Sequence, residues 1–388
     1  MYTVLYIARF TELTGVQVEI KALRKLLKGL GENGFSRKYK LIKALNRGGN
    51  SHSYKAYSYN LKKEVFIKFF LLPRHEIEIL KFRNEIAIHK LITWQGYIYE
   101  NAVIEFIESR LFKDNLGGYL VLEWLEGKSL DKVIEAYANK TIEEKVQLFH
   151  RVTNALIPLS RKITHRDLHP SNIMVMDESF EYEQLSHTPY NTGIKVVDFG
   201  ESYSSDVTTV SDLSIDDLIK IQKSHSRRLT TSLYATPPEY LRNYERNQNH
   251  IFDRSWNYDS WALGLIGYKI FFNEDIFEFE NIRDYVEEVH RNHFIFDIGD
   301  KISRKFYGLE HKQSKVLEHI FHYLLRVNPT ERTGDGDVGL ALSLINIRGY
   351  ELPENLASKE YMSFIRDGWF YLDRRGLTRP EDELENYG

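Results

Sequence analysis

The pattern of apolar and polar positions divides the chain into a strand-rich part followed by a helical part. From about residue 39 to 124, β-rich segments alternate with short polar breaks, and a helical segment interrupts them around 75–93. From residue 129 onward, apolar positions recur at the spacing of amphipathic helices. We therefore expect an α+β protein with a small sheet-based part, a larger helical part, and a ligand-binding cleft between the two.

Individual segments make this division concrete. The predicted strands are YKLIKAL, SYKAYSY, EVFIKFF and GYLVLEW. The predicted helices are SLDKVIEAYANK, TIEEKVQLFHRVTNALIPLSRK, YDSWALGLIGYKIFF and HKQSKVLEHIFHYLLRV. The change from strand to helix near EWLEGKS places the boundary between a smaller part at 39–124 and a larger part at 125–348.

Both ends extend beyond these parts. Residues 1–38 include EIKALRKLLKGLGENG, which we predict to be an amphipathic helix with basic residues on one side. We interpret the basic side as the solvated face of a helix that docks on the rest of the protein. Residues 349–388 form a C-terminal tail. Its dense aromatic residues favour docking on the protein, with partner binding as the alternative.

Composition excludes several classes of protein. The 388 residues are 42% hydrophobic with a net charge of −3, so the chain is globular and has no global field for nucleic acid. It contains no cysteine, which rules out disulfides and thiolate metal sites. No apolar run is long enough to span a membrane and no secretory signal is recognisable, so we expect a cytoplasmic location.

The segment THRDLHPSNIM carries the first candidate chemistry. Asp167 could act as a general base toward a hydroxyl, and the amide oxygen of Asn172 is a suitable ligand for Mg²⁺. Asp198 follows a β-branched apolar run in IKVVDFGES, where a carboxylate at the end of a buried strand suits a metal ligand. An isolated Asp/Asn pair would favour a structural hydrogen-bonded turn, so the catalytic interpretation depends on the rest of the chain.

A lysine in an apolar strand needs an anion. Lys68 lies in VFIKFF, and Glu85 lies in the helical segment FRNEIAIHKL that follows. Glu85 could supply one anion and the phosphates of ATP the others. A lysine on an edge strand, pointing at water, is the alternative for Lys68 considered alone.

These residues stand among a series of motifs, and together the motifs resemble a eukaryotic-type protein kinase of the serine/threonine kind. In chain order they are LNRGGNSHSYKA, Lys68, Glu85, LVLEWLEG, HRDLHPSN, DFG, PPE, DSWALG and NPTERT. The resemblance implies a bilobal fold, with an antiparallel sheet and one main helix in the N-lobe and mostly helices in the C-lobe. It also implies ATP as phosphate donor, Mg²⁺ or Mn²⁺, and a protein substrate.

The resemblance assigns roles to the candidate residues. Asp167 corresponds to the catalytic base, Asn172 and Asp198 to metal ligands, and Lys68 with Glu85 to the ion pair that holds the α and β phosphates. The nucleotide-binding residues are then Asn46, Gly48, Gly49, Ser51, Lys68, Glu123 and Leu125, with Leu122 as gatekeeper.

Several positions depart from the family pattern. Asn46 and Ser51 replace glycines of the phosphate loop, which makes close approach of its backbone to phosphate less favourable. Ser53 replaces a valine and Phe66 an alanine that form the adenine pocket, so we expect a narrower pocket.

Other residues match positions that support the site. His165 and Phe199 correspond to packing residues, and Asp259 to the carboxylate that caps the backbone of the catalytic loop. Glu239 and Arg332 correspond to a buried ion pair that anchors the segment before the substrate site. These assignments follow from the resemblance.

The segment from Asp198 to Glu239 is long and contains SDLSIDDLIKIQK, which we predict to be helical. Ordering such a segment is entropically costly, so something must stabilise it. One hypothesis is autophosphorylation within Ser204 to Ser232, with Arg166 binding the phosphate. The alternative is that the inserted helix packs on the lower lobe.

The nature of the acceptor remains open. His169 replaces the lysine or alanine that distinguishes kinase classes. PSN and the hydroxyls at 230–232, with Ser232 at the position where a threonine usually contacts the catalytic base, lean toward serine and threonine. The sequence DLHP also resembles the catalytic loop of small-molecule phosphotransferases of the aminoglycoside and choline kinase type. Those relatives lack the anchored PPE segment. A pseudokinase scaffold is the third alternative.

Overall fold

The computed structural model describes residues 19–45, 51–94, 102–160, 162–176, 192–227, 236–239, 258–277, 279, 282–290, 294–309, 314–327 and 332. Two compact units share the chain. The first unit comprises Met1–Glu126 with Phe199–Ser224, and the second comprises Gly127–Asp198 with His225–Gly388. Within the described ranges, no helix has the length and apolar character needed to cross a membrane.

The first unit is built on a five-stranded antiparallel sheet with the strand order β1-β2-β3-β5-β4. Its strands are β1 (Tyr39–Ala44), β2 (Ser51–Ser58), β3 (Lys63–Leu71), β4 (Phe106–Leu111) and β5 (Gly117–Glu123). All but β4 lie where the sequence predicts strands. Strand β4 is an edge strand that is half-buried to exposed along its whole length. Its sequence, FIESRL, therefore has no clear apolar face that would indicate a strand.

One face of the sheet carries the core of the first unit. Side chains alternate between the two faces of a strand, so Val65, Ile67 and Phe69 of β3 point to the same side. They pack there with Tyr54 of β2 and Tyr119 of β5 in a cluster of buried residues. The opposite face carries Lys68 and Phe66. The sheet therefore separates an apolar core from the face that holds the candidate site residues.

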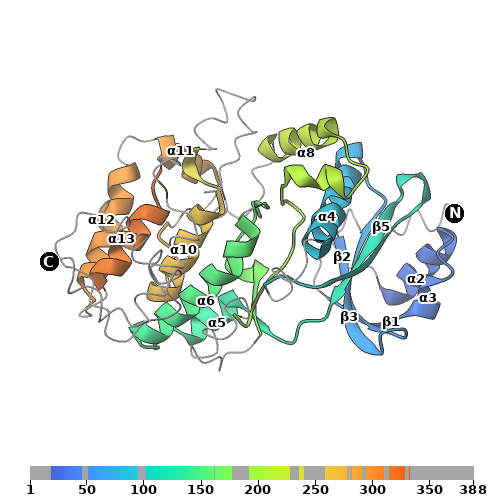
Figure 1. Cartoon of the computed structure of the whole chain (residues 1–388), viewed down its shortest axis with the longest axis horizontal. Coiled ribbons are helices and arrows are strands. Elements are labelled where there is room, and N and C mark those ends of the chain that lie inside the picture. Colours follow the sequence, from blue (N-terminus) through green and yellow to red (C-terminus); the bar gives the residue numbers. More distant parts are fainter. Residues whose placement is uncertain are drawn as a thin grey trace, which may run out of the picture. The chain divides into compact units, whose positions relative to one another are not determined.

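Two helices from the N-terminal extension cover this core face: α2 (Ile20–Gly29) and α3 (Phe35–Lys38) (Figure 1). Leu23, Leu26 and Leu27 of α2 are buried in the same cluster as the sheet residues. The ring of Phe35 in α3 lies between 5.3 and 5.4 Å from the rings of Tyr39, Phe69 and Tyr119. The predicted docking helix therefore completes the core of the sheet.

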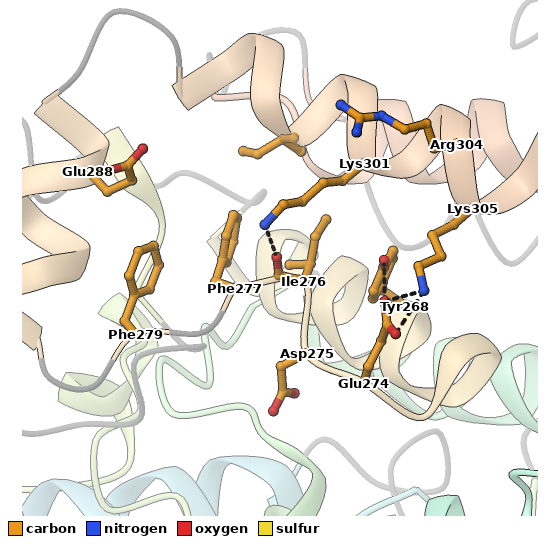
Figure 2. Close-up of a pocket in the computed structure, with 11 residues that line it drawn as sticks. Tyr268, Glu274, Asp275, Ile276, Phe277, Phe279, Glu288, Lys301, Arg304 and Lys305 are labelled. Atoms are coloured by element: carbon orange, nitrogen blue, oxygen red, sulfur yellow. Dashed lines mark hydrogen bonds and ion pairs between the residues drawn. The ribbon is translucent and has the colours of Figure 1, made fainter.

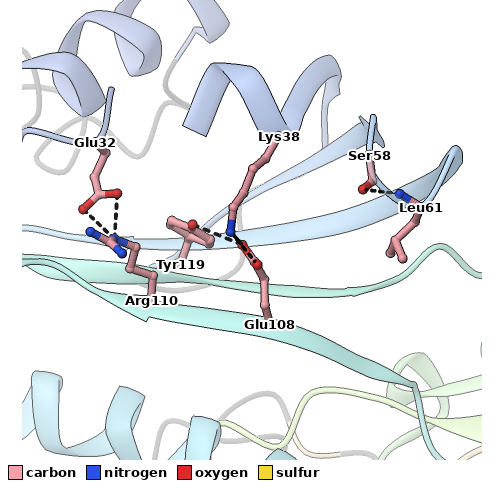
Figure 3. Close-up of polar contacts among 7 residues, drawn as sticks. All are labelled: Glu32, Lys38, Ser58, Leu61, Glu108, Arg110 and Tyr119. Atoms are coloured by element: carbon pink, nitrogen blue, oxygen red, sulfur yellow. Dashed lines mark hydrogen bonds and ion pairs between the residues drawn. The ribbon is translucent and has the colours of Figure 1, made fainter. Parts of the chain in front are cut away.

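Polar contacts join the same segment to β4 and β5, as Figure 3 shows. Lys38 Nζ lies 2.9 Å from Glu108 Oε2, and the hydroxyl of Tyr119 donates to Glu108 Oε1 at 3.2 Å. Arg110 Nε donates to Glu32 at 2.8 Å. Burial and the charge of Glu108 raise the pKa of Tyr119 well above its ordinary value, so its hydroxyl remains a donor. The exposed ion pairs add little stability, and the apolar contacts of α2 dominate.

Replacement of Leu23 by alanine is expected to destabilise the first unit by about 2–5 kcal/mol, because this fully buried side chain would leave a cavity. Chemical denaturation followed by fluorescence measures the change. Lys25→Ala, on the exposed face of the same helix, is the matched control and should change the free energy of unfolding by less than about 0.5 kcal/mol. Equal effects of both substitutions would show that α2 does not belong to the core.

The second unit is mainly helical. Its helices are α5 (Leu130–Ala136), α6 (Ile142–Ser160), α10 (Tyr258–Phe272), α11 (Ile282–His290), α12 (Phe294–Tyr307) and α13 (Ser314–Leu324). A small antiparallel sheet consists of β6 (Lys128–Ser129), β7 (Ile173–Val175) and β8 (Ile194–Val196). The four helices predicted by periodicity correspond to α5, α6, α10 and α13. Strand β8 lies where the sequence indicates a buried strand before Asp198. Periodicity alone does not reveal strands this short, since two or three residues carry no periodic signal.

Helix α10 forms the centre of the second unit, and most of its residues are buried. Glycines allow α6 and α13 to approach it closely. A Cβ atom at Gly267 would lie 2.6 Å from the ring of Phe149 in α6, and one at Gly264 would lie 2.7 Å from Leu325 after α13. Because α10 is apolar on all sides, it provides a rigid support for groups attached to its N-terminal end.

The first unit also contains a long helix and a segment that returns to it. Helix α4 (Glu76–Trp94) is the helix expected around 75–93. Residues 199–224 include η3 (Ser205–Thr209) and most of α8 (Ile215–Arg227), the helix predicted from SDLSIDDLIKIQK. Within the first unit, this segment contacts α4: η3 packs on the helix, Asn84 donates to the carbonyl of Ser202, and Lys220 of α8 donates to Glu76.

Candidate active site

In the first unit, Lys68 of β3 and Glu85 of α4 form an ion pair with 2.7 Å between Nζ and Oε1. The two side chains are 15% and 6% exposed. Because both side chains are largely shielded from water, loss of either partner would leave an uncompensated buried charge. The sequence predicted this contact, and it anchors the lysine ammonium on the side of the sheet away from the core.

Phe66 and Leu122 lie next to each other on this face of the sheet. The two residues are cross-strand partners in β3 and β5, and Ser53 of β2 is the partner of Lys68. Leu122 is buried and Phe66 is half-buried. The predicted gatekeeper, the predicted pocket phenylalanine and the lysine therefore share one face of the sheet.

Glu123 lies at the end of β5 and forms two hydrogen bonds with Glu105. Its backbone N–H donates to the carbonyl of Glu105 at 3.0 Å, and its Oε1 accepts from the N–H of Glu105 at 2.7 Å. Leu125, the other residue expected to bond adenine, lies two residues further on and is half-buried. Asn46, Gly48 and Gly49 of the predicted phosphate loop lie outside the described residues.

In the second unit, the loop that carries Asp167 is held by internal contacts. The side-chain nitrogen of Asn172 donates to the backbone carbonyl of Asp167 at 2.9 Å. This bond uses the amide nitrogen and leaves the oxygen of the Asn172 side chain outside it. His169 Nε2 lies 3.7 Å from Asp167 Oδ2, too far for a strong hydrogen bond. The loop thus presents one carboxylate and one amide oxygen together.

Asp259 at the start of α10 fixes the backbone of this loop. Its carboxylate accepts the N–H of His165 at 2.6 Å and the N–H of Arg166 at 3.0 Å. Burial raises the pKa of Asp259, while the two N–H donors and the charge of Arg166 act in the opposite direction. Arg166 has a positive φ of 66°, an uncommon conformation for a non-glycine residue. The rigid helix α10 thereby stabilises a strained loop.

Asp198 lies just after β8 and also has a positive φ, of 62°. The nearby imidazole of His165 donates from Nε2 to the carbonyl of Val197 at 3.1 Å, which ties β8 to the loop that carries Asp167. The N–H of Val197 donates to the carbonyl of Asn172 at 2.9 Å. Asp198 therefore follows a residue that is bonded to both ends of that loop.

Glu239 and Arg332 form a second buried ion pair, although they are distant in sequence. Two guanidinium nitrogens donate to the two carboxylate oxygens at 2.9 and 2.8 Å. The Arg332 side chain has no exposed surface, and it also donates to the carbonyl of Arg326 and lies 5.3 Å from the ring of Trp261. The ion pair expected from the resemblance is thus present in the structure.

A separate cavity of about 570 Å³ lies at the C-terminal end of α10, beside α11 and α12 (Figure 2). Several of its charged side chains already have partners. Glu274 accepts from Lys305 at 2.8 Å and from Tyr268 at 3.0 Å, and Lys301 donates to the carbonyl of Ile276 at 3.0 Å. None of the residues singled out from the sequence lines this cavity.

Sequence reasoning missed the residues that bind α4 to the segment after Asp198. Lys81, Asn84 and Glu201 are separated in the sequence and belong to no kinase motif recognised above. Their only sequence signal is that Lys81 and Asn84 are three positions apart, which places them on one face of the predicted helix.

Comparison with known families supports the reading of the motifs. The model of the family described as "Protein kinase domain" matches residues 39–341, most of the chain. The chain therefore belongs to the protein kinase family. Its bilobal α+β architecture, with the sheet in the first unit and most helices in the second, is the fold that the sequence predicted.

The relatives are named as protein kinases, two of the three below as serine/threonine-protein kinases. A probable serine/threonine-protein kinase of Dictyostelium discoideum is 29% identical over 201 residues, which is 52% of this chain and 25% of the relative. Calcium-dependent protein kinase 5 of Plasmodium falciparum is 25% identical over 65% of this chain and 37% of its own. PknA of Mycobacterium tuberculosis is 24% identical over 60% and 46%. The chain thus spans less than half the length of each of these relatives.

Proposed function

We propose that the chain is an ATP-dependent protein kinase that transfers the γ-phosphate to serine or threonine hydroxyls of protein substrates. Asp167 accepts the proton of the attacking hydroxyl. Lys68, oriented by Glu85, holds the α and β phosphates. Asn172 and Asp198 bind the metal ions that accompany ATP. Membership of the protein kinase family and the names of the relatives support this function.

One observation supports the role of Asp167 most strongly. Its Oδ1 is buried and accepts no hydrogen bond from any residue in the described part of the chain. An orphaned buried carboxylate oxygen is costly, so its retention is typical of an atom that meets a donor during function. A substrate hydroxyl is such a donor.

The donor set fits a divalent cation of the Mg²⁺ type. Asn172 and Asp198 supply an amide oxygen and a carboxylate, and hard cations prefer oxygen ligands. The cation, when bound, neutralises charge on the transferred phosphoryl group. The chain contributes the orientation, because the hydrogen bond from the Asn172 amide nitrogen to Asp167 leaves the amide oxygen as the group available for coordination.

The buried Glu239–Arg332 pair favours a protein substrate over a small molecule. In the family, this pair anchors the segment that precedes the substrate site, and here it is fully formed. The small-molecule phosphotransferases that share the DLHP motif lack this ion pair. Incubation with labelled ATP and either protein mixtures or panels of sugars, amines and aminoglycosides distinguishes the two activities.

Autophosphorylation belongs to the same proposal, with Arg166 as the phosphate-binding residue. Among the described hydroxyls, Ser204 caps η3, Ser211 donates to the carbonyl of Val207, and Ser214 is bonded to Asp217. These hydroxyls are occupied by local bonds. We therefore expect mass spectrometry after incubation with Mg²⁺ and ATP to find phosphate within 224–232 and not within 204–214. Phosphate confined to 204–214, or an active enzyme with no phosphate, would contradict this expectation.

Phe66→Ala is expected to lower the Michaelis constant for ATP or to leave it unchanged, because removal of the ring widens the space beside Leu122. Steady-state kinetics with varied ATP measures the effect. Ile67→Ala, on the core face of the same strand, should mainly reduce stability. A large increase of the Michaelis constant with Phe66→Ala would contradict a pocket narrowed by Phe66 and show that this strand is wrongly aligned with the family pattern.

A further inference from the structure

The cavity at the C-terminal end of α10 has an aromatic floor formed by Phe277 and Phe279. The two rings stack with 5.6 Å between their centroids and 22° between their planes (Figure 2). Phe277 is 9% exposed and stacks in turn on the buried Trp261 of α10, at 6.3 Å. The buried Ile298 of α12 lines the same cavity. An apolar side chain entering the cavity would therefore be transferred from water onto a preformed apolar surface.

One wall of the cavity is cationic, because α12 contributes Lys301, Arg304 and Lys305 to it. The second and third of these residues follow the first by three and four positions, which places all of them on one side of the helix. Arg304 lies 3.5 Å from Asp300, but both side chains are at least 70% exposed, so this pair contributes little. Lys305 pairs with Glu274 at 2.8 Å. Two of the three cations thus have a carboxylate beside them.

Lys301 differs from these two cations. Its Nζ donates to the backbone carbonyl of Ile276 at 3.0 Å and lies over the ring of Phe277, 6.0 Å from its centroid. Within the described ranges, no carboxylate pairs with this ammonium group. An ammonium group has three donors, and the carbonyl of Ile276 uses one of them. The positive charge of Lys301 and two donors are therefore available to a ligand above the aromatic floor.

These two features define the ligand that the cavity fits. The aromatic floor fits a large apolar side chain, and Lys301 fits a carboxylate close to it. A volume of about 570 Å³ is in the range of cavities that hold drug-sized ligands, so it takes a few side chains of a protein segment. Glu288 of α11 lies at the other end, beside Phe279 (Figure 2), so a carboxylate is favoured only on the side of α12.

Helix α10 sets the separation between the cavity and the catalytic loop. Asp259 at its start accepts the backbone N–H groups of His165 and Arg166, and its last residue, Phe272, leads into the residues that line the cavity. The helix has 15 residues and is about 20 Å long. A protein bound in the cavity and at Asp167 together would need at least about six residues of extended chain between the two points.

We propose that this cavity is a docking site for the protein substrate, and that it binds a segment in which a large apolar residue is followed by acidic residues. The apolar side chain lies on Phe277 and Phe279, and an acidic side chain accepts from Lys301. The inference rests on the proposed function, because the docked protein is the one that receives the phosphate. Docking raises the effective concentration of the acceptor hydroxyl near Asp167 and takes no part in the chemistry.

A double-mutant cycle between the full chain and a labelled peptide tests these contacts. The peptide contains a phenylalanine followed by glutamates. One counterpart has alanine in place of the phenylalanine, and the other has glutamines in place of the glutamates. Fluorescence anisotropy measures the dissociation constants, and we expect the first peptide to bind about tenfold more tightly than either counterpart. Lys301→Glu should remove the preference for glutamate over glutamine, and Phe279→Ala the preference for phenylalanine over alanine.

Arg326→Glu is the matched control for the charge reversal. It reverses an exposed cation of the same unit that does not line the cavity, so binding should stay within about twofold of the wild type. Phe279→Ala leaves the hydrogen bond of Lys301 to Ile276 in place and so tests the site independently of that bond. Equal binding of the three peptides by the wild type, preferences that persist in both variants, or an equal loss with Arg326→Glu would overturn the proposal.

Phosphate transfer shows whether docking serves the reaction. The acceptor peptide is the most strongly labelled site from a denatured protein mixture, joined to the acidic segment by a flexible linker of about twelve or about two residues. The long linker should raise kcat/KM about tenfold over the acceptor alone, and the short one should not, since it cannot span α10. Lys301→Glu should abolish this gain. The same gain with both linkers, or none with either, would overturn the proposal.

The two assays separate this inference from the proposed function. If the wild type transfers no phosphate to any protein, the proposed function fails and substrate docking fails with it. If the wild type phosphorylates proteins but does not distinguish the acidic peptide from its counterparts, the docking site alone is refuted.

Discussion

Replacement of Asp167 by alanine is expected to lower the rate of phosphate transfer by a factor of about 10² to 10⁴. The reason is that the orphaned Oδ1 is the acceptor proposed for the substrate proton, and no other carboxylate in the described part of that loop could replace it. The hydrogen bond from Asn172 goes to the backbone carbonyl of Asp167 and survives the substitution. The thermal midpoint should therefore change little, and transfer from labelled ATP to a protein mixture gives the rate.

Asp300→Ala is the matched control for this experiment. Asp300 is an exposed aspartate of α12 that pairs with Arg304 at 3.5 Å, so its removal should leave the rate unchanged. A wild type and an Asp167→Ala variant with the same rate would favour the alternative of a pseudokinase scaffold, because a scaffold does not need this carboxylate.

Replacement of Arg332 by methionine is expected to destabilise the second unit by about 3–5 kcal/mol, because it leaves Glu239 buried and unpaired. Methionine retains much of the apolar stem but supplies none of the donors that reach Glu239 and the carbonyl of Arg326. Urea denaturation followed by circular dichroism measures the loss. The double variant with Glu239→Gln should recover part of it, since the buried charge is then gone.

Arg326→Ala provides the control for this prediction. The Arg326 side chain is exposed, and the carbonyl that Arg332 contacts is part of the backbone. Its removal should change the free energy of unfolding by less than about 0.5 kcal/mol. If Arg332→Met unfolds at the same urea concentration as the wild type, the pair does not anchor the segment.

Much of the fold follows from the sequence because its signals are local. Four of the five strands of the large sheet show β-rich runs, and α10 matches YDSWALGLIGYKIFF along its whole length. The Lys68–Glu85 and Glu239–Arg332 contacts were predictable from motif positions, although each joins residues that are distant in sequence. These two contacts were predicted from the resemblance to the kinase family, and periodicity gave no indication of them.

The parts that were missed depend on tertiary contacts. Strand β4 forms because β5 offers it a partner, and its own sequence is too polar to indicate a strand. The sequence indicated that α2 docks, but not that it completes the core on the face opposite to Lys68. The attachment of the segment after Asp198 to α4 was also undetermined, because charged residues such as Lys81 and Glu201 show no preference for each other in sequence.

The most direct test of the kinase assignment is the transfer of label from γ-labelled ATP by the purified chain. Wild type and Asp198→Ala are incubated with Mg²⁺ and either a denatured protein mixture or a panel of sugars, amines and aminoglycosides. The account predicts label on serine and threonine of proteins with the wild type, and almost none with the variant. Label on small molecules alone, or equal label with both forms, would contradict it.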